Sequence, residues 1–157
     1  LEAVDQLRRS GVDAAAYLFG GVDRTVRRLI ARYEHCIAFA GPVPQADLAK
    51  AHQEMDVFVL PSLAEGMARS VIEAMASGLP VIVTPNCGYG DIVVEGYNGW
   101  TVPARGVPEI VERVAFLFRN PEEWQRIREN ARATAEKYTW SRYSEVTRKM
   151  YKELLEQ

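Results

Sequence analysis

The sequence predicts an α/β fold, a Rossmann-like parallel sheet with helices on both faces. Apolar runs of strand length alternate with segments of helical periodicity along the 157 residues. Short glycine-bearing connections such as Gly20-Gly21 and Gly41-Pro42 suit the right-handed crossovers that join parallel strands. The block from Met55 to Val83 shows the pattern most clearly, because it reads strand, helix, strand.

Each element of the first half follows from its own pattern. Segments in which apolar residues recur at every third or fourth position are predicted as helices, and β-branched or aromatic runs as strands. These rules place helices at 1–10, 23–33, 45–52 and 68–77, and strands at 14–19, 36–40, 55–60 and 79–83. Ligands of such sheets bind beyond the carboxyl ends of the strands, which is where Glu65 and Gly66 fall.

The second half is predicted to be mostly helical. In order, we expect a short helix over 91–95, an Asn98-Gly99 turn and a last strand over 100–102. Three helices then fill the C-terminal part, 107–157, the second of them with Asn120 as N-cap and Pro121 as its first residue. The third begins near Ser141. Its predicted packing side consists of Tyr143, Val146, Met150 and Leu154.

The composition agrees with one folded domain that binds small molecules. Hydrophobic residues make up 48% of the chain, which suits a sizeable core. A net charge of -2 gives no global attraction to nucleic acid. No apolar run approaches the ~18 residues of a spanning helix, and we see no secretory signal. Cys36 and Cys87 do not form a disulfide framework, which favours a reducing cytoplasm.

Two glutamates, Glu65 and Glu73, frame the start of the predicted helix over 68–77. Glu73 falls outside the apolar stripe of that helix, and Arg69 in the first turn opposes the helix dipole. An anion at the helix N-terminus would reverse this penalty, since free N–H groups there bind phosphate and a guanidinium adds charge-assisted bonds. Glu73 would then be placed to accept hydrogen bonds from a ribose. The alternative is a solvated Arg69–Glu73 pair worth at most ~0.5 kcal/mol.

The amino-acid sequence around Glu65 and Glu73 resembles the Glu-x7-Glu region of the retaining GT-B glycosyltransferases of family 4. The resemblance rests on Asp56-Val-Phe-Val-Leu-Pro-Ser62 and on Glu73-Ala-Met-Ala-Ser-Gly-Leu-Pro-Val-Ile-Val-Thr84. It continues in Phe39-Ala-Gly-Pro-Val-Pro44, which looks like the nucleobase loop of that family, in Gly96-Tyr-Asn-Gly99 and in Tyr138-Thr-Trp-Ser141. Because it covers almost all of the chain, it implies one half of a GT-B fold.

Carried over residue by residue, the resemblance implies a site for a nucleotide diphosphate-sugar. Glu65 is the expected catalytic residue and holds hydroxyls of the donor sugar, while Glu73 holds the ribose. The other expected donor contacts are the backbone of Pro42 and Val43 at the base, the amides of Gly66, Met67 and Ala68 with Arg69 at the diphosphate, and Gly88 in the loop 84–91. The resemblance implies no metal and no cofactor, with a UDP-, GDP- or ADP-sugar as substrate.

The chain departs from the family pattern in several places. Met67-Ala68 stand where many members have Phe-Gly, and Arg69-Ser70 stand where apolar residues are common. Cys87 replaces the first of two usual glycines, and a positive φ there would be costly. Asp91 is expected to cap the short helix that follows. A subset with a Gly-x-x-Arg pattern looks closer and includes enzymes that build bacterial cell-surface glycans.

The resemblance implies that residues 1–157 are the donor-binding domain of a retaining glycosyltransferase. In such enzymes this half begins with a strand and a loop whose Arg and Lys grip the donor phosphates, so we expect that strand, and the acceptor-binding half, to lie outside this chain. The acceptor would be a glycan or a lipid-linked sugar in bacterial cell-surface polysaccharide synthesis. The enzyme would be cytoplasmic, with contact to the inner face of the membrane as an option. The chain alone is expected to transfer nothing.

Two other functional classes remain open from the residues. One is half of a GT-B-like sugar-nucleotide epimerase, and the other is a non-catalytic α/β nucleotide-binding or docking domain, such as a receiver. A divalent ion shared by Glu65 and Glu73 is disfavoured by their separation. Cys87 lacks an activating base in the sequence, and His35 and His52 read as structural or solvated.

Overall fold

In the part of the chain that the structure describes, five short strands with parallel pairing form the centre. The computed structural model describes residues 1–89 and 91–156, without the side chains of Thr25 and Ala40. The strands are β1 (Ala16–Phe19), β2 (Ile37–Gly41), β3 (Phe58–Leu60), β4 (Val81–Val83) and β5 (Gly99–Thr101). β1 pairs with β2, and β3, β4 and β5 pair in that order, so the hydrogen bonding is split into a two-stranded and a three-stranded sheet.

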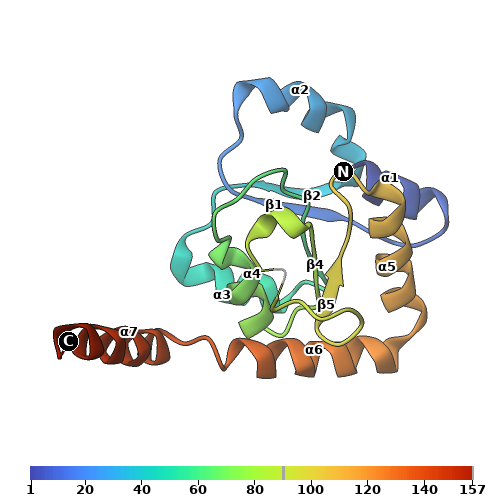
Figure 1. Cartoon of the computed structure of the whole chain (residues 1–157). Helices are drawn as coiled ribbons and strands as arrows, with labels where there is room; N and C mark the ends of the chain where they lie inside the picture. Colours follow the sequence, from blue (N-terminus) through green and yellow to red (C-terminus); the bar gives the residue numbers. More distant parts are fainter. Residues whose placement is uncertain (90, 157) are drawn as a thin grey trace.

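Helices cover both faces, as the alternating pattern predicts. They are α1 (Glu2–Arg9), α2 (Arg24–Arg32), α3 (Gln45–Gln53), α4 (Arg69–Ala76), α5 (Val107–Arg119), α6 (Pro121–Ala135) and α7 (Trp140–Leu155), with 3-10 turns η1 (Glu34–Cys36) and η2 (Pro85–Cys87). In Figure 1, α3 and α4 lie on one side of β4 and β5, and α1 and α5 lie on the other. α1 packs along α5, and α4 packs along α6.

The core explains why β4 is an unbroken apolar run. Val81, Ile82 and Val83 are each at most 1% exposed, because helices cover both faces of this strand. Val81 and Val83 pack with Val71, Ala74 and Met75 of α4. Ile82 points to the opposite face, where it packs with Trp100, Ile110 and Ile127. The period of two along a strand therefore divides the core into two layers.

The prediction of a short helix over 91–95 is wrong. The chain there forms a turn and an isolated bridge between Glu95 and Gly99. The buried side chain of Asn98 provides the physical reason, since its Oδ1 accepts from the Val94 N–H at 2.8 Å and its Nδ2 donates to the Ile92 carbonyl at 2.9 Å. An amide side chain has thus taken the backbone groups that a helix would use. No cap at Asp91 is needed.

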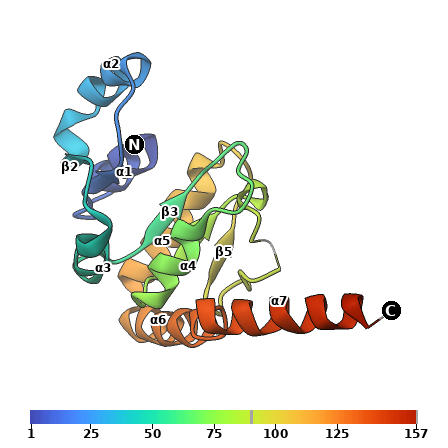
Figure 2. The ribbon, with the colours of Figure 1, turned by 90° about the vertical axis from the view of Figure 1, so that its left-hand side faces the viewer.

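α7 forms where the pattern predicts a helix, but its predicted packing side is not packed. Thr139 caps it through a hydrogen bond from the Arg142 N–H at 3.2 Å, so the helix begins one residue before Ser141. The prediction for Tyr143, Val146, Met150 and Leu154 is wrong in this structure, where they are 64%, 51%, 59% and 65% exposed. Figures 1 and 2 show α7 projecting away from the rest of the chain. Periodicity reports an apolar face and not what covers it.

Trp124 is the C-terminal aromatic residue that does join the core. It packs against the second core layer, and its indole N–H donates to the Asp56 carbonyl at 2.9 Å. Tyr138, Trp140 and Tyr151, which are aromatics of the same region, are exposed. Within the described residues, none of the helices combines the length and apolarity needed to cross a membrane.

Candidate functional site

The loops that follow β3 and β4 lie against each other at the carboxyl ends of these strands. The Glu65 N–H donates to the Asn86 carbonyl at 2.9 Å, and the Ala68 N–H donates to the Cys87 carbonyl at 3.2 Å. These two bonds hold residues 61–68 beside residues 84–88. The structure thus brings Glu65 and Gly66 next to the glycine-bearing loop, as the sequence predicts.

The two loops also come close together at Gly66 and Gly88. A Cβ on Gly88 would stand 2.2 Å from the Gly66 carbonyl oxygen, and Gly88 has a φ of +76°. Both the space and the backbone angle therefore require glycine at this position. The positive φ falls on Gly88 and not on Cys87, so the replacement of a glycine by Cys87 carries no backbone cost.

Buried polar groups beneath these loops fix the position of Glu65. Thr84 is 1% exposed, and its hydroxyl donates to the Ser62 carbonyl at 2.6 Å. The Ser62 hydroxyl in turn donates to Oε1 of Glu65 at 3.1 Å, which leaves the exposed carboxylate oriented at the surface. Cys87 is 0% exposed and its thiol donates to the Leu60 carbonyl at 3.4 Å, so its role here is structural.

Glu73 joins a third loop to the site. It lies half-buried in the second turn of α4, where its Oε1 accepts from Nε2 of Gln45 at 3.2 Å. Gln45 is the first residue of α3 and comes directly after the loop of Pro42 and Val43 that follows β2. The structure thereby places the expected base loop beside the expected ribose acceptor, although the residues come from different strands.

The N-terminus of α4 lies between the two glutamates and has no side-chain cap. Its N-cap is Ala68, a residue that cannot accept a hydrogen bond from the first turn. The N–H groups of Arg69 and Ser70 are among those that an α-helix leaves without an intrahelical partner. The Ala68 amide, expected to face a phosphate, is already bonded to Cys87, which corrects that part of the expectation. The amides that remain in the expected set of anion donors are those of Gly66, Met67 and the first turn of α4.

Two further residues, Tyr89 and His52, interact electrostatically with Glu73. Burial raises the pKa of the Tyr89 phenol, while Arg69 opposes that shift and Glu73 adds to it. Burial lowers the pKa of His52, and Glu73 partly counteracts this. Sequence reasoning placed neither residue near Glu73. The available signal for His52 was its position seven residues after Gln45, which puts both on one face of α3.

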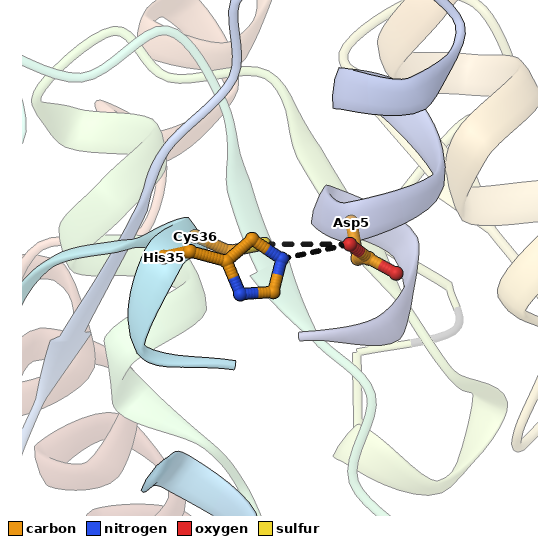
Figure 3. Close-up of side chains that lie close together, drawn as sticks. All are labelled: Asp5, His35 and Cys36. Atoms are coloured by element: carbon orange, nitrogen blue, oxygen red, sulfur yellow. Dashed lines mark hydrogen bonds and ion pairs between the residues drawn. The ribbon is translucent and has the colours of Figure 1, made fainter. Parts of the chain in front are cut away.

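A second polar cluster joins α1 to η1. Figure 3 shows Asp5, His35 and Cys36 close together, with Oδ1 of Asp5 2.9 Å from Nε2 of His35 and 3.9 Å from Sγ of Cys36. These three ligand types lie within 4.8 Å of one another. However, Nη2 of Arg9 lies 2.8 Å from Asp5, and the hydrogen bond from His35 lowers the pKa of that carboxyl. The surrounding positive charge disfavours a cation, so we assign the cluster a structural role.

The fold and the site together define a class of protein. Loops at the carboxyl edge of a parallel sheet, with an uncapped helix N-terminus between two carboxylates, are typical of α/β nucleotide-binding domains. The chain belongs to the family of glycosyl transferases group 1, whose family model matches residues 1–134.

The relatives agree with this family. The chain is 34% identical over 130 residues to WcaL of Salmonella typhimurium, a glycosyltransferase named for colanic acid biosynthesis. The alignment covers 76% of this chain and 32% of that protein. It spans about a third of the length of the curated relatives it matches.

Solved structures show the same fold. The C-terminal domain of the glycosyl transferase group 1 family protein LpcC from Francisella tularensis superposes with a TM-score of 0.76 at 22% identity, over 88% of this chain and 76% of that one. The pneumococcal O-GlcNAc transferase GtfA, solved in complex with UDP and GlcNAc, superposes with a TM-score of 0.81 at 21% identity, over 99% of this chain and 32% of that one. The fold is therefore that of one half of GT-B glycosyltransferases.

Proposed function

We propose that this chain is the donor-binding domain of a retaining glycosyltransferase that uses a nucleotide diphosphate-sugar. The observation that carries the proposal is the arrangement around the N-terminus of α4, with Glu65 on one side, Glu73 on the other and Arg69 in the first turn. This arrangement offers carboxylates for hydroxyl groups at two ends and donors for an anion between them. A nucleotide diphosphate-sugar has hydroxyl groups on its ribose at one end and on its sugar at the other, with the negatively charged diphosphate between them.

Each part of the donor has a matching contact. The base lies against the backbone of Pro42 and Val43, and the ribose hydroxyls donate to Glu73, which Gln45 already holds in place. The diphosphate faces the amides of Gly66 and Met67 and the first turn of α4, which contains Arg69. The sugar lies beside the Gly66–Gly88 contact, and its hydroxyls donate to Glu65. The UDP bound to GtfA supports a nucleotide donor.

The chemistry that these residues provide is stabilisation of the leaving group. Negative charge develops on the departing diphosphate as the glycosidic bond breaks, and oriented amides with an arginine stabilise that charge without reorganisation. Glu65 acts on the sugar side, where its hydrogen bonds strengthen as the sugar gains positive character. The reaction proceeds with retention and uses no bound metal. Phosphate-binding Arg and Lys residues outside this chain supply the remaining positive charge.

The acceptor is a glycan or a lipid-linked sugar. The role is in bacterial cell-surface polysaccharide synthesis, which the relationship to WcaL, named for colanic acid biosynthesis, supports. The family match favours glycosyl transfer over the epimerase and docking classes.

The test is calorimetric titration of the full-length protein with UDP, GDP and ADP. Glu73→Gln keeps the size of the side chain but replaces a charged acceptor, so we expect binding of the preferred nucleotide to weaken by about 1–3 kcal/mol. Glu54→Gln is the matched control, because Glu54 is exposed and follows the other end of α3. Equal affinities for the wild type and Glu73→Gln, or no binding of any of the three nucleotides, would overturn the proposal.

A further inference from the structure

Tyr89 is a buried polar residue that the proposed donor contacts do not use. It follows Gly88 in the loop after β4, and it is only 5% exposed. Its carbonyl accepts from the N–H groups of Ile92 and Val93 at 3.0 and 3.1 Å, which ties its backbone to the residues that follow. A buried tyrosine combines an apolar ring with a hydroxyl group that usually has a hydrogen-bond partner.

The side chain of Tyr89 packs at the start of α4. It belongs to the core layer that includes Ala68, the N-cap of this helix, and Val71 in the first turn. The Ala68 N–H also donates to the carbonyl of Cys87, two residues before Tyr89. The loop and the helix start are therefore joined by a backbone bond and by apolar packing, and together they fix where the phenol lies.

The hydroxyl group of Tyr89 has no hydrogen-bond partner within residues 1–89 and 91–156. In that part of the chain, the fully buried side-chain atoms without a partner are Nδ1 of His52, Oε2 of Glu109 and Nε of Arg113. The Tyr89 oxygen is not one of them, so part of the small exposed surface of this residue lies on its oxygen. The oxygen thus reaches the surface unpaired, where it is free to bond to a ligand.

Arg69 and Glu73 are the charged groups that act on this phenol. They lie four positions apart on α4 and so share one side of the helix. The ion pair between them is not formed, because Glu73 accepts from Gln45 and the guanidinium of Arg69 has no partner among the described residues. Burial raises the pKa of the Tyr89 phenol, while Arg69 lowers it and Glu73 raises it. The phenol therefore stays protonated at neutral pH and can donate.

We propose that the Tyr89 hydroxyl donates to the phosphate that is attached to the ribose of the bound nucleotide. This inference rests on the proposed function and adds a residue to that site. In the proposed site Arg69 faces the diphosphate and Glu73 the ribose, and the 5′-phosphate is the group that joins these two parts. A hydroxyl that interacts with both residues lies at that junction.

The contact is specific for the phosphate and not for the base. Every nucleotide carries the same 5′-phosphate, so the contribution of Tyr89 should be the same for UDP, GDP and ADP. A nucleoside lacks the acceptor and should not detect the hydroxyl. Since the donor is neutral, it supplements the positive charge of Arg69 with a directed bond.

The test is a calorimetric titration of the full-length wild type and Tyr89→Phe. The ligands are the preferred one of UDP, GDP and ADP, the corresponding monophosphate and the corresponding nucleoside. Tyr89→Phe retains the ring, so we expect an unchanged melting temperature. Binding of the monophosphate and the diphosphate should weaken on the order of tenfold, because a hydrogen bond to a charged acceptor is lost. Binding of the nucleoside should not change.

Tyr97→Phe is the matched control. Tyr97 lies in the same connection between β4 and β5, but it is 44% exposed and interacts with Arg126 of α6. This variant should bind all three ligands as the wild type does.

The outcomes separate this inference from the proposed function. Equal affinities of the wild type and Tyr89→Phe for the diphosphate would overturn the inference alone. Equal weakening for nucleoside and diphosphate would also overturn it, because the hydroxyl would then act only by shaping the loop. If the wild type binds none of the three diphosphates, the proposed function and the inference fail together.

Fluorine NMR provides a measurement that does not depend on the fold of a phenylalanine variant. With 3-fluorotyrosine at position 89, both the ring and the hydroxyl are kept. We expect its signal to shift on addition of the monophosphate and to stay in place with the nucleoside, while the same label at position 97 responds to neither. A signal at position 89 that does not respond to the bound monophosphate would contradict the contact.

Discussion

Glu65 and Glu73 are held by different neighbours, and this difference separates their predicted roles. Ser62 orients Glu65, which we propose faces the sugar, and Gln45 orients Glu73, which we propose faces the nucleoside. In the full-length enzyme we expect Glu65→Ala to lower turnover strongly and to leave affinity for the free nucleoside diphosphate nearly unchanged, because contacts to the sugar strengthen as the bond breaks. Glu73→Ala should instead weaken binding of the nucleotide itself.

Turnover at saturating donor, paired with thermal melts, checks this assignment. If Glu65 only stabilises its loop through the Ser62 hydrogen bond, Glu65→Ala should cost about 0.5–2 kcal/mol of stability and leave the folded enzyme fully active. That pair of results would refute the catalytic role.

At Gly88, both the positive φ and the lack of space for a Cβ favour glycine. Gly88→Ala should destabilise the fold by more than the ~1–3 kcal/mol typical of a left-handed non-glycine residue, because its Cβ would also stand 2.2 Å from the Gly66 carbonyl oxygen. Gly96→Ala is the matched control, since Gly96 has a φ of +65° but nothing within 4 Å of the added carbon. Denaturant unfolding of both variants compares them. Equal losses of stability would mean that the two loops do not pack as described.

His52 makes stability depend on pH in a definite direction. Its ring lies 6.0 Å from the ring of Phe19 and 5.9 Å from that of Phe58, and burial lowers its pKa below the ordinary value of about 6.5. As pH falls through that value, the unfolded chain takes up a proton before the folded chain does, so stability is complete above it and is lost below it. We expect the melting temperature to fall between pH 7.5 and 5.5. In His52→Phe this part of the fall should vanish, and an unchanged pH dependence would exclude His52 as its source.

Among the elements, α6 and α7 differ most in what they contribute to stability. Ile127 of α6 is 0% exposed, so Ile127→Ala should cost about 2–5 kcal/mol of unfolding free energy. α7 buries none of its residues, so removal of residues 139–157 should leave the melting temperature of the chain almost unchanged. Calorimetric melts of both variants test this contrast. A large loss on truncation would mean that α7 packs on the domain in solution.

The elements also show what the sequence can and cannot predict. The order of helices and strands followed from periodicity, because residues such as Val81 to Val83 and the apolar side of α4 are apolar for a local reason. The turn around Asn98 was missed because one buried amide side chain decides it. The surroundings of α7 were missed because a periodic pattern contains no information about the partner of the apolar face.

At the site, the same limits apply. The places of Glu65 and Gly66 followed from the topology of strand ends, which a sequence does report, whereas Gly88 was expected from the family resemblance. The bond between Gln45 and Glu73, and the burial of His52 beside it, depend on how α3 packs on α4. That packing joins residues 28 positions apart and leaves no mark in either local pattern.

At the scale of the whole molecule, the parallel pairing of the strands places three loops together at the carboxyl ends of the strands. The loops after β2, β3 and β4 meet around the N-terminus of α4, and each contributes one expected part of the donor site. The two-layer core on either side of β4 supports this edge, and the loops themselves are held by hydrogen bonds from the buried side chains of Thr84 and Cys87. The site thus depends on the complete fold and not on any one motif.

The most direct test of the central claim is an NMR titration of the isotopically labelled chain with UDP, GDP and ADP, read out residue by residue. We predict that at least one of these ligands shifts the amide signals of Val43, Gly66, Met67, Glu73 and Gly88 together, because these residues surround the proposed donor site. Shifts confined to another surface, or no shifts with any of the three at millimolar concentration, would contradict the account.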